Sequence, residues 1–528
     1  MKKLFVFLSV FSVCVVMLSA AALAEHSGSA GNTAWSISDS GKLTITGSGE
    51  MNREAASYSS GWKKYGEEIK TVEIGDGITS ICFDAFSYCD NITAISIPAS
   101  VERLDVSEYN ETPFNDLAKL RTITVDSGNQ HFTVYGGVLF NKSKSTLIFH
   151  PPARTETSYT IPSSVTRIGD DAFYESENLT SVTIPGSVTY IGDGAFVRTS
   201  LSGALTIPDS VTYLGAAAFE ETNITSVKLP AGLTKINDYL FSTCDSLESI
   251  TLPGTVTSIG DNAFFWCEKL PGIDIPDGVE YIGQYAFCGC TGFTSISIPD
   301  SVFYIGSCAF TNCTGLADSG GFVIVDNTLF GYFGTKTDVT VPQSVITVGT
   351  SAFVFGQYTL TGDPGPASVT LPATVFNIDT QAFKASTLSD TVLNLKEVKI
   401  YNSRAQFGEG AFALPAETLS GLVISGWPDS TASVYAASHN IRFRPLSVPD
   451  PDLFLPSSLT AIPKYAFTGI SAKAVVIPES VSVISANPFS GSSIKAVYGY
   501  EGSAAQTFAD KYGYYFVPID DAWMESHK

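Results

Sequence analysis

The chain has 528 residues, with 30 basic and 52 acidic side chains, a net charge of −22 and only 16% charged residues. Because 44% of the residues are hydrophobic and 12% aromatic, the chain can bury a large core, which excludes wholesale disorder. The acidic balance excludes a nucleic-acid partner, since such a partner requires a basic surface. Five histidines leave little material for histidine-based catalysis or a histidine metal cage.

The first 24 residues have the layout of a secretory signal peptide. Lys2 and Lys3 are followed by an apolar stretch at 4–18 and by a small-residue cleavage site at 22–24. The alternative is an uncleaved membrane anchor, but a membrane span needs about 20 apolar residues. No later segment is long enough. We therefore expect residues 1–24 to be removed, an extracellular location, and no membrane span after cleavage.

A repeat of 22 or 23 residues dominates the chain from Thr160 onward, where the first of seven near-perfect copies reads TIPSSVTRIGDDAF. The prolines recur in step, at Pro162, Pro185, Pro208, Pro230, Pro253, Pro276 and Pro299. The phenylalanines keep the same step, at Phe173, Phe196, Phe219, Phe241, Phe264, Phe287 and Phe310. Degenerate copies extend in both directions. One unit of this length cannot close its own core, so stacking of the units is predicted to bury a continuous core.

The letters of one unit predict a short strand that ends at proline. Around Pro185, Val182 and Ile184 lie on one face of the strand, and Ser181 and Thr183 lie on the other. Proline ends the strand because it has no N–H to donate to a neighbouring strand.

The second half of the unit predicts a corner and a core residue. Gly192 is expected to need a positive φ, since Asn237 and Asp379 replace it in other copies and both residue types tolerate that conformation. Ala195 and Phe196 follow, and the phenylalanine is expected to fill the core.

The unit L-x-x-I-x-I-P-x-x-V-x-x-I-G-x-x-A-F-x-x-C resembles the BspA-type class of leucine-rich repeats over residues 70–519. The resemblance implies a repeat solenoid: a β-rich, right-handed arc with about 23 residues per coil and a β-sheet on its concave face. It also implies a secreted or cell-surface binding role, since some members of the family bind host matrix proteins.

The flanks and interruptions of the repeat suggest caps and inserts. Residues 25–70 are predicted to form an N-terminal β cap that includes a hairpin at 32–50. The leucine-rich-repeat solenoid is assigned to 71–446, with β-hairpin inserts near 131–152 and 316–340.

The end of the chain contains a duplicated feature. A segment with a short helix at 432–438 is predicted to cap the solenoid near 422–446. A second such segment, with a helix at 504–511, closes a short second repeat pair at 447–519. Residues 520–528 are predicted to be a tail.

Five cysteines follow the repeat phenylalanine at the same offset: Cys89, Cys244, Cys267, Cys290 and Cys313. They predict a structural column of buried thiols, because strand spacing exceeds the Cβ separation of about 3.8 Å that a disulfide prefers. Disulfides stay an alternative in a secreted chain, above all for Cys82, Cys288 and Cys308. No metal site is predicted, because Cys288-x-Cys290 has the wrong spacing for zinc and no histidine partner.

The sequence contains none of the common hydrolase, zinc-protease, phosphate-loop or dinucleotide motifs. Acidic residues such as Asp170, Asp171, Asp193 and Asp261 recur at turns, which is the pattern of solvated corners. A carboxylate pair for glycoside hydrolysis and calcium at the acidic turns stay alternatives. We predict no enzymatic activity and no cofactor.

Candidate binding residues lie five positions after the repeat proline: Tyr190, Tyr213, Tyr281 and Tyr304. Adjacent coils would place the first two side by side, and likewise the last two. Phe265 and Trp266 are expected to protrude from a turn. Exposed aromatic side chains anchor protein and glycan ligands, although these tyrosines could equally pave a solvent-facing strand.

A second candidate surface is a flat, weakly charged face of hydroxyl side chains: Ser181, Thr183, Thr206, Ser226, Ser249, Thr251, Ser295 and Ser297. It could bind a partner by hydrogen bonds or be inert. The sequence therefore predicts a non-catalytic binding or adhesion scaffold for an extracellular protein or glycan. The alternative is a structural component of an extracellular matrix or envelope layer, and a remote alternative is an enzyme-associated module. The oligomeric state is not predicted.

Overall fold

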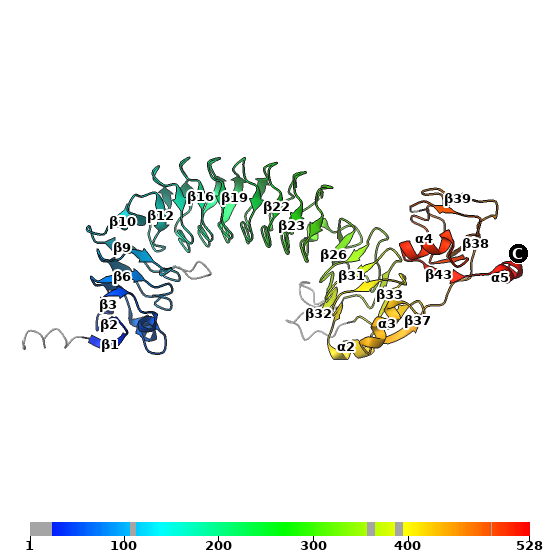
Figure 1. Cartoon of the computed structure of the whole chain (residues 1–528), viewed down its shortest axis with the longest axis horizontal. Helices are drawn as coiled ribbons and strands as arrows, with labels where there is room; N and C mark the ends of the chain where they lie inside the picture. Colours follow the sequence, from blue (N-terminus) through cyan, green and yellow to red (C-terminus); the bar gives the residue numbers. More distant parts are fainter. Residues whose placement is uncertain (1–23, 106–111, 356–364, 386–393, 487, 528) are drawn as a thin grey trace, which may run out of the picture. The chain divides into compact units, whose positions relative to one another are not determined.

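The computed structural model describes residues 24–105, 112–355, 365–385, 394–486 and 488–527 (Figure 1). Residues 1–23 of the predicted signal peptide lie outside the described residues, so that assignment stays a prediction. The chain divides into two compact units: one runs to Gly292 and includes Pro299–Gly306, and the other comprises Phe293–Ile298 and the chain from Ser307 onward.

The first unit begins with an antiparallel arrangement that changes into a parallel one. Its six-stranded sheet has the order β1 (Ala24–Ala30), β2 (Thr33–Ser38), β3 (Lys42–Gly47), β5 (Thr71–Ile74), β7 (Ala94–Ile97) and β9 (Thr122–Val125). β2 and β3 pair antiparallel at the predicted hairpin, whereas β3, β5, β7 and β9 pair in parallel. A second parallel sheet contains β4 (Gly49–Glu50), β6 (Ile78–Ile81) and β8 (Arg103–Leu104).

Two 3₁₀ helices that the sequence did not predict lie between β4 and β5. They are η1 (Arg53–Ala56) and η2 (Trp62–Glu68). The Trp62 side chain is fully buried, and its indole N–H donates to the carbonyl of Ala85 at 2.9 Å. This bond attaches η2 to the first coil, whose turn comprises residues 82–89.

A β-hairpin interrupts the repeat where an insert was predicted. β10 (Phe132–Tyr135), β11 (Val138–Asn141) and β12 (Thr146–Phe149) pair antiparallel. β12 then pairs in parallel with the first regular coil, so the insert continues the sheet of the coils that follow.

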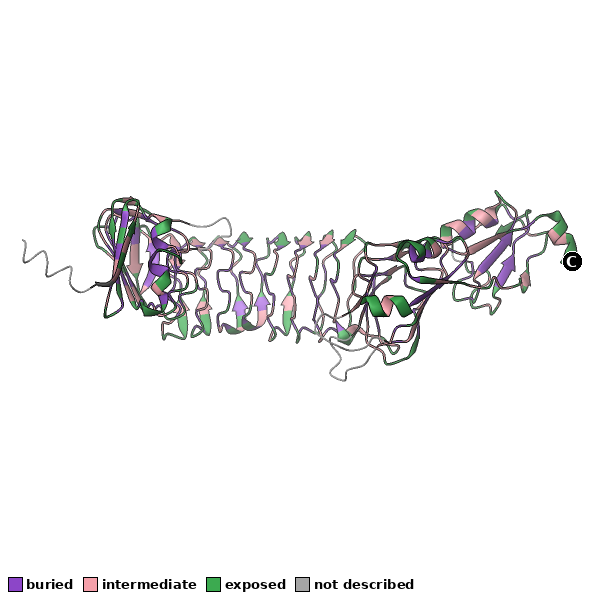
Figure 2. Ribbon diagram, turned by 90° about the horizontal axis from the view of Figure 1, so that it is seen from below, coloured by how far each residue is buried: buried purple, intermediate pink, exposed green. Residues whose placement is uncertain are grey.

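The first regular coils each contribute two short strands, which Figure 2 shows as two rows on opposite sides of the stack, whereas the coils of β23 and β24 contribute only the second strand. The first strand of the coil is β13 (Ser158–Thr160), β15 (Ser181–Thr183), β17 (Ser202–Thr206), β19 (Asn223–Lys228) or β21 (Ser249–Thr251). The second is β14 (Arg167–Ile168), β16 (Tyr190–Ile191), β18 (Tyr213–Leu214), β20 (Lys235–Ile236), β22 (Ser258–Ile259), β23 (Tyr281–Ile282) or β24 (Tyr304–Ile305). Paired strands of neighbouring coils run parallel, with equivalent residues opposite each other.

A column of phenylalanines fills the core between the two rows. Phe173, Phe196, Phe219, Phe241 and Phe264 have no exposed surface, and neighbouring rings stack at centroid distances of 4.7 to 5.9 Å. Burial of such a side chain contributes about 1.5–3 kcal/mol, and ring stacking adds about 0.5–1.5 kcal/mol. The strict period of the sequence therefore becomes a continuous core.

The expectation of a positive φ at Gly192 was wrong. Gly192 has no positive φ, but a Cβ there would lie 2.6 Å from the Asp170 nitrogen and 2.7 Å from the Gly169 carbonyl carbon. At Gly192 the absence of a Cβ lets the backbone of the preceding coil pass close by. Neither Asn237 nor Asp379 has a positive φ.

The left-handed residues of each turn lie two and six positions after this glycine. In the first regular coil they are Asp171, with φ 52°, and Glu175, with φ 55°. Their N–H groups and that of Phe173 donate to carbonyls of the next coil, at 2.9 Å, 3.0 Å and 2.8 Å respectively. Bonds between coils thus compensate for a conformation that most side chains disfavour.

The second unit repeats this pattern with longer coils. Its insert comprises η3 (Thr314–Leu316) and the antiparallel pair β25 (Phe322–Val325) and β26 (Thr328–Tyr332), which continues into β28 (Thr347–Val348), β31 (Asn377–Ile378) and β34 (Gln406–Phe407). A five-stranded parallel sheet contains β27 (Asp338–Thr340), β30 (Ser368–Leu371), β33 (Glu397–Ile400), β36 (Val423–Gly426) and β37 (Arg442–Pro445). A third sheet contains β29 (Phe353–Phe355), β32 (Phe383–Ala385) and β35 (Phe412–Ala413).

Short helices accompany the end of this sheet and of the next one. α2 (Ala416–Gly421) was not predicted, and α3 (Thr431–Ser438) lies between β36 and β37. The last sheets are β38 (Leu453–Phe454), β40 (Ala474–Val476), β42 (Ala496–Gly499) and β43 (Tyr515–Pro518), and β39 (Ala461–Ile462) with β41 (Val483–Ile484). α4 (Ala504–Tyr512) lies between β42 and β43, and α5 (Asp521–Ser526) replaces most of the predicted tail.

The predicted second repeat pair packs against the coils that precede it. Trp427 stacks on Tyr515 at 4.6 Å, and Arg404 forms an ion pair with Asp510 at 2.7 Å. The fold is thus a β-rich arrangement of parallel strands in stacked coils, while the right-handed solenoid and the domain boundaries stay predictions.

Candidate functional site

The parallel register of the second strands brings the predicted tyrosines together in two pairs. Tyr190 lies opposite Tyr213 in β16 and β18, and Tyr281 lies opposite Tyr304 in β23 and β24. The ring centroids are 4.6 Å apart in the first pair and 4.8 Å apart in the second, with interplanar angles of 11° and 6°. We call these four residues the tyrosine pairs.

One ring of each pair is more exposed than the other. Tyr213 and Tyr304 are 38% and 46% exposed, whereas Tyr190 and Tyr281 are half-buried. The guanidinium of Arg167 lies 3.6 Å from the ring centroid of Tyr190, a cation–π contact that covers its other face. Each pair therefore presents one accessible aromatic side chain.

Aspartates of the preceding coil orient the tyrosine hydroxyls. The Tyr213 hydroxyl donates to Asp193 Oδ1 at 3.3 Å. Burial and the neighbouring Asp193 carboxylate raise the pKa of Tyr213 to about 12, and burial together with Asp261 raises the pKa of Tyr281. Both phenols stay neutral at physiological pH and keep their hydrogen-bonding hydroxyls.

The same carboxylates bind the backbone of the next coil, which corrects the expectation that they are simply solvated corners. Asp170 accepts from the Asp193 N–H at 3.2 Å, and Asp193 accepts from the Ala216 N–H at 2.9 Å. Asp170 is half-buried, and burial raises its pKa. These acids stabilise the stack as well as contributing negative charge.

The tyrosine pairs do not form one continuous strip. Lys235 and Ser258 occupy the equivalent positions of the coils between them, and Ser258 lies opposite Tyr281. The accessible surface therefore alternates between aromatic and polar side chains.

Phe265 and Trp266 do not protrude as expected. Both are half-buried, and the Trp266 ring lies against Gly289, where a Cβ would come within 2.9 Å of its Cγ. Phe265 contacts Tyr285 edge to face at 6.5 Å. The two residues belong to the turn after β22, not to the strands that hold the tyrosine pairs, and the structure does not bring the two sets together.

The hydroxyl face is exposed but offers no aromatic anchor. Ser181, Thr183, Thr206, Ser249, Thr251, Ser295 and Ser297 are exposed, and Ser226 is half-buried. It remains the second candidate surface.

The predicted cysteine column is buried at Cys89, Cys244, Cys267, Cys290 and Cys313. The thiols of Cys244, Cys267 and Cys290 each donate to the carbonyl of a phenylalanine in the preceding coil at 3.2 Å. Burial raises the pKa of Cys89 and of Cys244 to about 12, so these thiols are poor nucleophiles. The geometry gives these side chains a structural contact rather than a reactive one.

A serine–histidine contact exists but is inaccessible to a substrate. His150 Nδ1 lies 2.9 Å from Ser176 Oγ, and each side chain is only 1% exposed. Burial lowers the pKa of His150 to about 3, so the ring is neutral. It cannot serve as a base for a substrate that it cannot contact.

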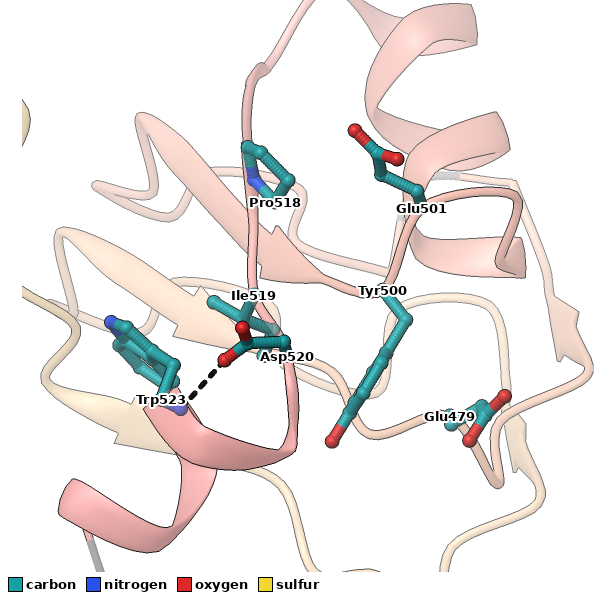
Figure 3. Close-up of a pocket in the computed structure, with 7 residues that line it drawn as sticks. All are labelled: Glu479, Tyr500, Glu501, Pro518, Ile519, Asp520 and Trp523. Atoms are coloured by element: carbon teal, nitrogen blue, oxygen red, sulfur yellow. Dashed lines mark hydrogen bonds between the residues drawn. The ribbon is translucent and has the colours of Figure 1, made fainter.

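A depression of ≈540 Å³ near the C-terminus is acidic (Figure 3). Its lining includes Glu479, Glu501 and Asp520 but no basic side chain. Asp520 is used as the N-cap of α5, where it accepts from the Trp523 N–H at 2.7 Å.

Two aromatic rings already stack on Trp523 in this depression. Tyr498 lies at 5.3 Å and His527 at 4.0 Å. The acidic lining of the depression therefore repels anions, and part of the indole surface is already in contact with these rings.

The described part of the chain has two further properties, which concern membranes and metals. No helix among these residues is both long and apolar enough to cross a bilayer. Within the same residues, no three His, Cys, Asp or Glu side chains gather in an arrangement that could hold a metal ion.

Comparison with known protein families gives one consistent match. A model described as the BspA type leucine rich repeat region (6 copies) matches residues 64–158, 153–271, 257–389 and 451–503, which is more than half of the chain. No curated protein matches the chain.

Comparison with solved structures gives several partial likenesses. A leucine-rich repeat protein from Eubacterium ventriosum is 24% identical, over 54% of this chain and 93% of that chain, with a TM-score of 0.40. One from Bacteroides ovatus is 21% identical, over 93% and 100%, with a TM-score of 0.35. A leucine rich cell surface protein from Faecalibacterium prausnitzii is 21% identical, over 94% and 99%, with a TM-score of 0.29. We draw no functional conclusion from these likenesses.

Proposed function

Because the chain belongs to the BspA-type leucine-rich repeat family, we propose that it is a secreted or cell-surface scaffold that binds an extracellular protein or glycan without catalysis. Leucine-rich repeat proteins are typically non-catalytic and generally bind proteins. The right-handed solenoid is part of this proposal, and the parallel register of successive coils supports it.

The observation that carries the proposal is the in-register stacking of the tyrosine pairs. Their outer rings, Tyr213 and Tyr304, are fixed by a stacked partner yet stay accessible. A fixed aromatic side chain loses little conformational freedom on binding, and tyrosine combines apolar area with a hydroxyl. We infer that a ligand contacts these rings and the polar side chains between them.

The negative charge around the tyrosine pairs also indicates which kind of ligand they bind. Aspartates beside the pairs, such as Asp193 and Asp261, keep the surface anionic and disfavour polyanionic ligands. A neutral or basic partner surface fits better.

The test is binding of residues 25–528 to arrays of host matrix proteins and glycans. We expect at least one specific ligand whose affinity falls by roughly tenfold or more in the double variant Tyr213→Ala/Tyr304→Ala, since interface tyrosines often contribute more than 1 kcal/mol. The matched control is Tyr135→Ala, which removes a tyrosine that is 52% exposed outside the pairs.

Two results would count against the proposal. Flat signals across both arrays would contradict a binding scaffold, and assembly of the chain into layers would favour the structural alternative. Binding that survives the double variant would move the ligand to another surface, such as the hydroxyl face.

A further inference from the structure

A second depression, of ≈310 Å³, lies where the non-repeat segment with η1 and η2 meets the turn of the first coil. It is lined by residues from both parts, among them Arg53, Tyr58, Lys63, Asp84 and Tyr88. Its volume is at the lower end of the range of about 300–1,000 Å³ that is typical of small-ligand pockets.

Two unusually exposed aromatic side chains flank this depression. Tyr58 is 67% exposed and Tyr88 is 68% exposed. Their rings meet edge to face, with centroids 5.8 Å apart at 65°. Unlike the parallel rings of the tyrosine pairs, they meet through the edge of one ring, so more aromatic surface stays open to a ligand.

The polar part of the depression is held in place by ion pairs. Lys63, only 7% exposed, places its Nζ 3.1 Å from Asp84 Oδ2, and an Arg53 nitrogen lies 3.3 Å from the same oxygen. The Arg53 guanidinium also lies 4.0 Å from the Phe83 ring centroid. A buried ion pair is weak evidence for stability, because desolvation offsets much of the attraction. What it provides here is a fixed position for donors and acceptors.

The charges of the lining are balanced. Arg53 and Lys63 contribute two cations, while Glu54 and Asp84 contribute two carboxylates. The depression therefore has no net attraction for an anion or a cation, yet it offers N–H and O–H donors beside carboxylate acceptors. The ligand that matches open aromatic faces and mixed hydrogen-bonding groups is neutral and rich in hydroxyls.

We propose that this depression binds one neutral sugar ring of a glycan. The C–H face of the ring packs on Tyr58 and Tyr88, and the hydroxyls exchange hydrogen bonds with Arg53 and the acidic side chains. The site lies on other elements than the tyrosine pairs, so it does not depend on the function proposed for them.

The experiment uses residues 25–528 and the methyl glycosides of glucose, galactose, mannose and N-acetylglucosamine, and neutral oligosaccharides of the same sugars. Saturation-transfer NMR detects binding, and calorimetry measures it. The variant is Tyr58→Ala/Tyr88→Asn, because Tyr88 has φ 63° and asparagine tolerates this left-handed conformation. The control Tyr135→Ala removes a 52% exposed tyrosine elsewhere, and thermal melting verifies that each variant is folded.

We expect at least one neutral sugar to bind, with an affinity that falls roughly tenfold or more in the double variant and stays unchanged in the control. Because the ligand is neutral, raising the salt concentration should leave the affinity nearly constant. The proposal is overturned by the absence of binding across the panel, by equal binding to the double variant, or by binding that requires a charged ligand. The Tyr213→Ala/Tyr304→Ala variant separates the two proposals, since it should keep the sugar and lose the ligand of the tyrosine pairs.

Discussion

The regular coils and the first coil use the same repeat positions in different ways. In the regular coils, the turn N–H groups of Asp171 and Glu175 donate to the next coil. In the first coil the equivalent positions are Asp84 and Tyr88, and their side chains meet Lys63 and Tyr58 from outside the repeat. The repeat thus determines the backbone conformation of the turn, whereas the neighbouring segment determines which contacts the side chains make.

The glycine position gives the same lesson. Gly192 is restricted by the turn of the coil before it, but the first coil has Cys82 at this position, and β4 rather than a regular coil precedes it. The close approach at Gly192 therefore comes from the stacking of coils and not from the conformation of a single coil.

Breaking the phenylalanine column should have the largest effect. Phe219→Ala is expected to lower the free energy of unfolding by about 3–5 kcal/mol, because it leaves a cavity between two stacked rings. Urea denaturation followed by hydrogen exchange of the coils measures the change. Tyr88→Asn, at an exposed ring with a left-handed φ that asparagine tolerates, should stay within about 0.5 kcal/mol, and equal losses in both would refute the contrast between the regions.

A methyl group at the glycine position should have the next largest effect. Gly192→Ala is expected to lower the free energy of unfolding by about 1–3 kcal/mol, because its Cβ would meet the backbone of the preceding coil. Gly186→Ala is the control, since a Cβ there meets nothing within 4 Å, and it should be neutral or stabilise by up to about 1 kcal/mol. Chemical denaturation distinguishes these opposite signs, and a loss at both positions would contradict the close-approach explanation.

His150, at the junction between the insert and the regular coils, should make stability depend on pH. The ring is neutral in the folded chain, where its pKa is about 3, but in the unfolded chain it takes up a proton below a pKa of about 6.5. Between these two pKa values the unfolded state binds more protons than the folded state. The free energy of unfolding is therefore highest above about pH 6.5 and falls as the pH decreases below it.

Between pH 7 and pH 5 the expected loss is about 1–2 kcal/mol, measured from urea midpoints. His150→Gln cannot take up the proton, so its unfolding free energy should vary less over the same interval, even if it is lower at pH 7. The same pH response in wild type and variant would show that other groups are responsible.

Removal of one turn carboxylate should have the smallest effect. Asp193→Ala removes the acceptor of the Ala216 N–H and of the Tyr213 hydroxyl, and should lower the free energy of unfolding by about 0.5–1.5 kcal/mol. Asp193→Asn keeps an acceptor oxygen and should recover most of the loss. A stability equal to wild type in Asp193→Ala would return this residue to a purely solvated role.

The sequence predicted the side-chain stacking that follows from the 23-residue spacing of the repeat. Tyr190 and Tyr213 are 23 positions apart, as are Phe173 and Phe196, so stacking alone places them side by side. The sign of φ at Gly192 was not predictable in this way, because a glycine column has two explanations, and only the distance to the preceding coil separates them.

The depression beside η1 and η2 was only half visible in the sequence. Coils such as the one with Glu175 have a polar residue at the repeat position that Tyr88 occupies in the first coil. The aromatic residue at this position was therefore a sequence signal for the depression. Tyr58 and Lys63 lie in a segment without repeats, so no alignment of coils relates them to Asp84. Their meeting follows from how η2 packs, through the buried Trp62, on the turn.

The direction of the turn hydrogen bonds has a consequence for the length of the chain. Each regular turn donates its N–H groups forward and accepts from the coil behind it, as from Phe173 to Ala195 and from Phe196 to Ala218. A coil that accepts from the coil before it in the same way as it donates to the coil after it behaves as an interchangeable module. Deletion or duplication of one whole copy rejoins matching donors and acceptors, so gene rearrangements can lengthen or shorten the stack of coils without creating a new exposed edge.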